Sequence, residues 1–181
     1  RRVWPVSRAE QAFRHMAQAR HIGKIVLEMA DTQARIARPL PRPLPLKADG
    51  TYLLTGGLGG FGLAVAEWLV ARGAGTVVLA GRSGAATPEA QAGVDRLRSG
   101  GARVRVERCD ITDRAAVDAM LSRIRAELPP LRGVLHAAMV LDDDHVLNLD
   151  RDRLARVTAP KVQGALNLHL ATRDDPIELF M

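Results

Sequence analysis

The pattern of apolar and polar positions changes at about residue 50. From Thr51 onward, short apolar runs alternate with longer stretches in which apolar residues recur every three or four positions. The short runs predict buried strands, and the longer stretches predict helices with one buried face. The predicted strands are residues 51–55, 76–82, 102–110, 132–138 and 177–181. Strands that alternate with helices indicate an α/β fold with a doubly wound parallel sheet, here truncated within its fifth strand.

Two of the predicted helices in this region have ends marked by particular residues. Thr112 is expected to cap the helix that follows the third strand, because a threonine side chain can accept a hydrogen bond from the first turn. Asp150 is expected to open a later helix. Proline has no N–H group, so Pro160 should interrupt that helix and Lys161 should restart it.

The first 50 residues have a different organisation. Ser7 and Glu10 have the spacing of a capping box before a short helical pattern, and residues 23–29 predict a strand. One helix and one strand cannot form a core, so residues 1–30 are expected to dock on sequence outside this unit. Residues 38–50, "RPLPRPLPLKADG", carry prolines at alternate positions and predict a stiff linker that spans about residues 31–50.

The charge and the cysteine content limit which classes of function and which compartment fit this chain. The formal net charge is +6, but the arginines are scattered and do not alternate with aromatic residues, so we do not expect nucleic-acid binding. A phosphate-bearing ligand or an acidic protein partner fits this charge better. Cys109 is the only cysteine and indicates a reducing, cytoplasmic compartment; it ends a strand and is expected to be buried and inert. We expect no membrane span and no metal site.

A glycine-rich stretch, "TGGLGGFG", follows the first strand of the α/β region and precedes its first helix. It satisfies both G-x-G-x-x-G and T-G-x-x-x-G-x-G. Bare backbone lets a pyrophosphate approach, and a helix N-terminus offers N–H groups to it. The stretch therefore predicts a Rossmann-type dinucleotide site; the alternative is a tight turn without a ligand. The candidate residues are Thr55, Gly56, Gly57, Leu58, Gly59, Gly60, Phe61 and Gly62.

The ends of the next two strands indicate which dinucleotide binds. Arg82 is the last residue of the second strand and Ser83 follows it, at the place where an NAD site usually carries an acidic residue. A guanidinium suits a 2′-phosphate, so the predicted cofactor is NADPH; the alternative is one more surface arginine. Asp110, followed by Ile111, ends the third strand. Asp110 is predicted either to accept a hydrogen bond from the adenine amine or to serve as a turn residue before Thr112.

Five segments in order resemble a known family. These segments are "TGGLGGFG", "AGRSG", "CDITD", "HAAMVLDD" and "APKVQGALNLH". Together, over residues 51–181, they resemble the ketoreductase domain of polyketide synthases, a branch of the short-chain dehydrogenase/reductase superfamily. Residues 13–29 resemble the C-terminal end of the enoylreductase domain that precedes it. The resemblance implies an enoylreductase tail over residues 1–30, the linker, and then the N-terminal part of the NADPH-binding ketoreductase domain.

The resemblance also implies a reaction and its partners. NADPH would reduce a β-ketoacyl thioester to the β-hydroxyacyl thioester, while a tyrosine donates a proton, a lysine keeps that tyrosine acidic and a serine binds the carbonyl. The substrate would be carried on the phosphopantetheine of an acyl carrier protein. Enoylreductase and dehydratase domains of the same synthase would be neighbours.

The resemblance also implies functional roles for particular residues of this chain. Lys161 matches the family's catalytic lysine, and the family's cofactor-lining segment falls on His136, Ala137 and Ala138. Met139 stands where the family usually has glycine. Asp143, in "LDD", matches the signature of ketoreductases that form the (3R) alcohol. An ordinary acidic loop is the alternative for Asp143.

The catalytic serine and tyrosine of the family pattern would lie beyond Met181. The only tyrosine, Tyr52, has Gly56 four positions later and so forms no Tyr-x-x-x-Lys pair. The chain does not begin with Met, and we expect it to be a segment of a larger synthase that is inactive by itself. The alternatives are a non-catalytic Rossmann-like module that scaffolds neighbouring domains, and a different NADP-dependent reductase or epimerase.

Overall fold

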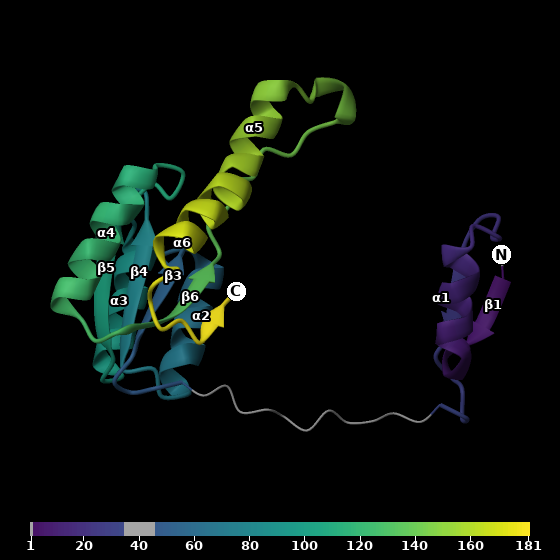
Figure 1. Cartoon of the computed structure of the whole chain (residues 1–181), viewed down its shortest axis with the longest axis horizontal. Coiled ribbons are helices and arrows are strands. Elements are labelled where there is room, and N and C mark those ends of the chain that lie inside the picture. The colour runs from purple at the N-terminus through teal and green to yellow at the C-terminus, as the bar shows by residue number, and fades with distance from the viewer. Residues whose placement is uncertain (1, 35–45) are drawn as a thin grey trace. The chain divides into compact units, whose positions relative to one another are not determined.

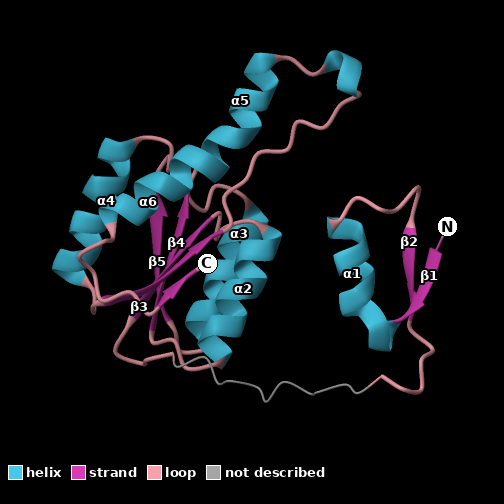
Figure 2. Cartoon of the chain, turned by 45° about the vertical axis from the view of Figure 1, so that its right-hand side comes forward, coloured by secondary structure: helices cyan, strands magenta, loops and turns pink. Residues whose placement is uncertain are grey.

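The computed structural model describes residues 2–34 and 46–181, which form two compact units. The predicted linker falls mostly on residues 35–45 and lies outside the described residues. The first unit pairs strand β1 (Arg2–Pro5) in parallel with strand β2 (Ile25–Glu28), and helix α1 (Ala9–Ala17) connects them (Figure 2). Ala12 is the buried residue of α1, whereas Phe13 and Met16 are exposed.

The capping box predicted for the first helix is wrong. A 3₁₀ turn, Val6–Arg8, precedes α1, so the N-cap position falls on Arg8, and no side chain caps the helix. Ser7 instead donates its backbone N–H to Asp31 Oδ2 at 2.9 Å. Strand β1 was not predicted, because four residues that end in proline carry too short a pattern to distinguish a strand from a loop.

Five parallel strands form the sheet of the second unit, as the sequence predicts. They are β3 (Thr51–Thr55), β4 (Thr76–Gly81), β5 (Arg103–Arg108), β6 (Leu131–His136) and β7 (Leu179–Phe180). Their order is β5-β4-β3-β6-β7, with β3 in the centre (Figure 1). The direction in which strands are added reverses at β3, and ligands of such sheets bind beyond the carboxyl ends of the strands at this point.

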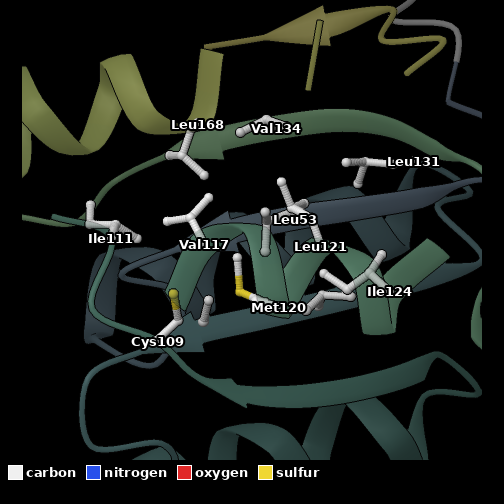
Figure 3. Packing of buried hydrophobic residues seen from close by; sticks show 12 residues of the cluster. Leu53, Cys109, Ile111, Val117, Met120, Leu121, Ile124, Leu131, Val134 and Leu168 are labelled. Carbon is white, nitrogen blue, oxygen red and sulfur yellow. The ribbon is translucent and has the colours of Figure 1, made fainter. Parts of the chain in front are cut away.

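Helices cover both faces of the sheet, and alternate residues of β3 face opposite ways. Tyr52 and Leu54 pack with α2 (Gly60–Ala71) and α3 (Pro88–Ser99). On the other face, Leu53 packs with α4 (Arg114–Glu127) and α6 (Ala165–Ala171) (Figure 3). The core residues labelled there include Val117, Met120, Leu121, Ile124 and Leu168.

Two predicted helix ends need correction. Asp113, not Thr112, caps α4: its Oδ1 accepts hydrogen bonds from the N–H groups of Ala115 and Ala116. Pro160 does not interrupt the helix that begins after Asp150. Helix α5 (Arg151–Ala159) continues through a π-helical segment, Pro160–Gly164, into α6 (Figure 1). The wider π turn accommodates a residue that cannot donate a backbone hydrogen bond.

None of the helices in residues 2–34 and 46–181 has the length and apolar character needed to cross a membrane.

Candidate functional site

A cavity of about 320 Å³ lies at the carboxyl ends of β3, β4, β5 and β6, at the switch point of the sheet. It brings together five predicted site residues: Gly56, Arg82, Asp110, Ile111 and Ala138. Its other lining residues are Ala80, Gly81, Cys109, Thr112, Met139, Val140, Arg156, Ala159 and Pro160. Arg156 had no local sequence signal, because it reaches the cavity from a helix far along the chain.

The turn between β3 and α2 requires glycine at three positions for packing. At Gly56 (φ +68°), a Cβ atom would lie 2.6 Å from the carbonyl oxygen of Ala137. At Gly57, a Cβ atom would lie 2.8 Å from the carbonyl oxygen of Leu54. At Gly62, a Cβ atom would lie 2.3 Å from the carbonyl oxygen of Gly56. These backbone contacts fold the turn tightly over the end of the sheet.

Two other glycines of the same turn have no such packing reason. A Cβ atom at Gly60 would have nothing within 4 Å, and one at Gly59 would make only an ordinary contact. Gly59 is the N-cap residue of α2, and no side chain caps that helix. Among the residues that the structure describes, the first N–H groups of α2 therefore have no side-chain partner, as an anion site at a helix N-terminus requires. Phe61 is largely exposed beside them.

Asp110 is held by the residue two positions later. Its Oδ1 accepts hydrogen bonds from the backbone N–H of Thr112 at 2.9 Å and from the Thr112 hydroxyl at 2.7 Å. These bonds, with a smaller contribution from the positive charge of Arg82, lower the pKa of Asp110. The predicted turn role of Asp110 is thus confirmed, while its contact with adenine stays a prediction. Arg82 and Ser83 are both exposed, and Ser83 is outside the cavity lining.

Cys109 forms part of the cavity wall, and its side chain is buried. Burial and the neighbouring Asp110 carboxylate raise the pKa of its thiol to about 11. The nucleophilic thiolate is therefore scarce at neutral pH. The predicted burial of this cysteine at a strand end is confirmed, and its raised pKa agrees with the prediction that it is inert.

His136 lies behind the cavity, with both ring nitrogens bonded to the protein. Its Nε2 is 2.9 Å from the carbonyl oxygen of Pro160, and its Nδ1 is 2.6 Å from Thr55 Oγ1. A carbonyl only accepts, so Nε2 carries a proton; in the neutral ring, Nδ1 then accepts from the Thr55 hydroxyl. The predicted contact of His136 with the cofactor stays a prediction.

Lys161 is exposed and directly follows Pro160, a cavity-lining residue. The segment around it packs closely on the cavity wall, since a Cβ atom at Gly164 would lie 2.5 Å from Ile111 Cδ1. The buried Asn167 side chain donates to the carbonyl oxygens of Ile111 and Thr112 at 2.9 and 3.0 Å. Asn167 was missed, although a single polar residue beside Leu168 on a helix face is a usable signal.

The acidic loop that contains Asp143 is tied to α5 by its other two aspartates. Asp142 accepts from Arg153 at 2.6 Å and from Arg156 at 2.9 Å, and Asp144 also pairs with Arg153. Asp143 is exposed and, among the described residues, makes no hydrogen bond or ion pair. It lines a second cavity, of about 690 Å³, between this loop and α5.

Comparison with known proteins identifies relatives over nearly the whole chain. The KR domain family matches residues 50–181. The highly reducing polyketide synthase poxF of Penicillium oxalicum is 44% identical over 93% of this chain. The phenolphthiocerol synthesis polyketide synthase type I Pks15/1 of Mycobacterium marinum is 43% identical over 99% of it. A solved A-type ketoreductase of a modular polyketide synthase matches 81% of the chain with 37% identity and a TM-score of 0.70.

This chain spans a small part of those relatives. It covers 7% of the first synthase, 8% of the second and 31% of the solved ketoreductase chain.

Gly62→Ala is expected to lower the free energy of unfolding by about 1–3 kcal/mol, because the new Cβ meets backbone that cannot rotate away. Gly60→Ala is the matched control. It lies in the same turn with open space around it, so stability should stay the same or rise by up to about 1 kcal/mol. Urea unfolding followed by circular dichroism measures both. Equal effects of the two substitutions would contradict the packing argument.

Arg153→Met is expected to loosen the loop of residues 142–149 at neutral pH. Hydrogen bonds from Arg153 lower the pKa of Asp142, and those from Asn148 and Arg153 lower the pKa of Asp144. Carboxylates with a lowered pKa stabilise the fold above their ordinary value of 3.8, and this contribution disappears as the pH falls through the folded-state pKa. Amide exchange in the loop should therefore be about 2- to 5-fold faster in the variant at pH 7.

The same difference should vanish at a pH well below 3.8. Arg151→Met changes the charge equally, on a neighbouring residue that the structure gives no ion pair among the described residues, and should exchange like the unsubstituted protein. A difference that persists unchanged in acid would show that Arg153 does not act through these two carboxylates.

Proposed function

The chain belongs to the KR domain family, the ketoreductase domains of polyketide synthases, and on that premise we propose that it contributes the cofactor half of an NADPH-dependent ketoreductase. The reaction is the reduction of a β-ketoacyl thioester to the β-hydroxyacyl thioester. The observation that carries this proposal is the cavity at the switch point of the sheet, where the glycine turn, Arg82 and the first residue of the π-helical segment that contains Lys161 meet.

Ketoreductase domains of the short-chain dehydrogenase/reductase superfamily use nicotinamide cofactors. We propose NADPH because Arg82 is exposed at the cavity edge and has no ion-pair partner among the described residues. The Gly59–Gly60 backbone and the uncapped start of α2 would receive the pyrophosphate. The second carboxylate oxygen of Asp110 is available to the adenine amine. The cofactor itself supplies the hydride.

Lys161 is the residue of this chain to which we assign a part in proton transfer. As an ammonium group at the cavity rim, it would favour the phenolate form of a neighbouring tyrosine and so make that tyrosine a better proton donor. The oxygen of the substrate then takes the tyrosine proton as hydride reaches the β-carbon. The family pattern places this tyrosine, and the serine that binds the carbonyl, after residue 181.

We further propose the setting of the reaction. The substrate is carried on the phosphopantetheine of an acyl carrier protein, and enoylreductase and dehydratase domains are neighbours. The N-terminal unit, assigned to the end of an enoylreductase domain, lies outside the family match, yet the alignment to the M. marinum synthase includes it. The reaction takes place in the cytoplasm, in keeping with a single, buried cysteine.

Arg82→Ala tests the cofactor in a polypeptide that carries the complete ketoreductase domain. With a β-ketobutyryl N-acetylcysteamine thioester as substrate, kcat/KM for NADPH should fall about 10- to 100-fold, because a charge-assisted contact to the 2′-phosphate is lost. The rate with NADH should stay within about 3-fold. Arg72→Ala, whose guanidinium stacks on Trp68 at the end of α2, is the control for loss of one positive charge.

Equal losses with both coenzymes would refute the 2′-phosphate assignment. If the complete domain oxidised no NADPH with this thioester, the ketoreductase proposal would fail, and the scaffold alternative would replace it.

Asp143→Asn tests the proposed (3R) outcome. Asp143 carries an unpaired, exposed carboxylate at the second cavity, where it is available to orient the substrate. Its loss should reduce the (3R):(3S) ratio of the product about 10-fold, which chiral chromatography measures directly. Asp152→Asn, on the exposed first turn of α5, should leave the ratio unchanged. A product ratio that is the same in both variants would remove Asp143 from stereocontrol.

A further inference from the structure

Two hydrogen bonds connect the end of the central strand to the residue before Lys161. We propose that His136 is a positioning residue: it holds the Pro160 carbonyl and thereby fixes where Lys161 enters the site, while the Thr55 hydroxyl fixes the imidazole. This inference rests on the role proposed above for Lys161.

The Pro160 carbonyl determines the direction of one bond, and the protonation of the ring then determines the direction of the other. The Pro160 oxygen requires a donor, and the distance of 2.9 Å assigns that donor to Nε2. In a neutral ring, Nδ1 is then the acceptor, 2.6 Å from the Thr55 hydroxyl. Thr55 is fully buried at the end of β3, and its backbone is paired with both β4 and β6. The imidazole is therefore anchored to the central, fully buried strand of the sheet.

Holding this carbonyl has a direct effect on Lys161. The Pro160 carbonyl and the Lys161 N–H belong to the same planar peptide unit. Fixing the oxygen fixes that plane, and with it the direction in which the Lys161 side chain leaves the helix. The plane lies at the first residue of the π-helical segment, where the regular α-helical bonding pattern changes. A widened turn has more freedom than an α-helix, so an external partner is needed to define it.

A second anchor holds the helix after Lys161 independently. The Asn167 amide binds two carbonyl oxygens of the cavity wall, and Gly164 packs against Ile111. Removal of the His136 bonds should therefore leave α6 docked and the fold intact. Only the short segment between the two anchors, which contains Lys161, would lose its fixed orientation.

The main test is a double-mutant cycle in the complete ketoreductase domain. His136→Leu should lower kcat about 10- to 100-fold and change the KM for NADPH by less than about 3-fold, because a small misplacement of a catalytic group affects chemistry more than binding. His136→Gln keeps an N–H donor with similar reach to Pro160 and should recover most of kcat. His169→Leu, on the exposed side of α6, is the control and should stay within about 2-fold.

The Lys161→Met variant shows whether His136 acts through Lys161 or only supports the fold. If His136 acts through Lys161, adding His136→Leu to Lys161→Met should lower kcat no further. A further 10-fold loss in the double variant would overturn the inference while leaving the proposed function in place. Full activity of Lys161→Met alone would instead overturn the role proposed for Lys161.

The protonation of His136 in the unsubstituted domain tests its proposed role even if the His136→Leu variant does not fold. Long-range ¹H–¹⁵N spectra report which ring nitrogen is protonated. The proposal requires His136 to be protonated at Nε2 and bare at Nδ1 at neutral pH. The opposite tautomer would place the donor away from Pro160 and would refute the proposal.

Discussion

The pairing of β3 between β4 and β6 is the constraint on which the site depends. All five residues of β3 are buried, and its last residue, Thr55, lies level with Ala80 of β4 and His136 of β6. This register brings the glycine turn, the end of β4 and the His136 imidazole to one edge of the sheet. A shift of one residue would reverse the faces of Tyr52 and Leu53 and separate these groups, so the core that stabilises the sheet also aligns the site.

The site is built from groups of unequal rigidity. Asp110 is fixed by Thr112, and the Asn167 side chain bridges helix α6 to the same loop. By contrast, the loop with Asp143 has no core residue and is held by ion pairs between partly exposed side chains. Such pairs contribute little stability. The end of the site that we assign to the cofactor is therefore held by more hydrogen bonds from buried or backbone groups than the end that we assign to the substrate.

The features of the fold that depend on residues close together in the sequence were predictable from it. The strands of the α/β region, their parallel direction and the glycine turn follow from periodicity and from residues that are neighbours in the sequence. The cap at Asp113 was placed one residue early, since Thr112 and Asp113 are both good caps and only the Thr112 hydroxyl bond to Asp110 decides between them. The Thr55–His136–Pro160 chain was inaccessible, because it joins residues 81 and 24 positions apart. The continuous helix through Pro160 was missed because proline ordinarily breaks a helix, and here a π-helical turn accommodates it.

The glycines of the turn between β3 and α2 are needed for two different reasons. At Gly56 and Gly62, the protein's own backbone leaves no room for a Cβ atom, so a tight fold explains them without any ligand. At Gly60, a side chain would meet nothing, and a better helix former than glycine would fit there. Glycine at that position is costly to the folded chain, and it lies where N–H groups at the start of α2 lack a side-chain cap. Packing does not account for glycine at this position, whereas the dinucleotide that we propose, which must approach the backbone closely, would account for it.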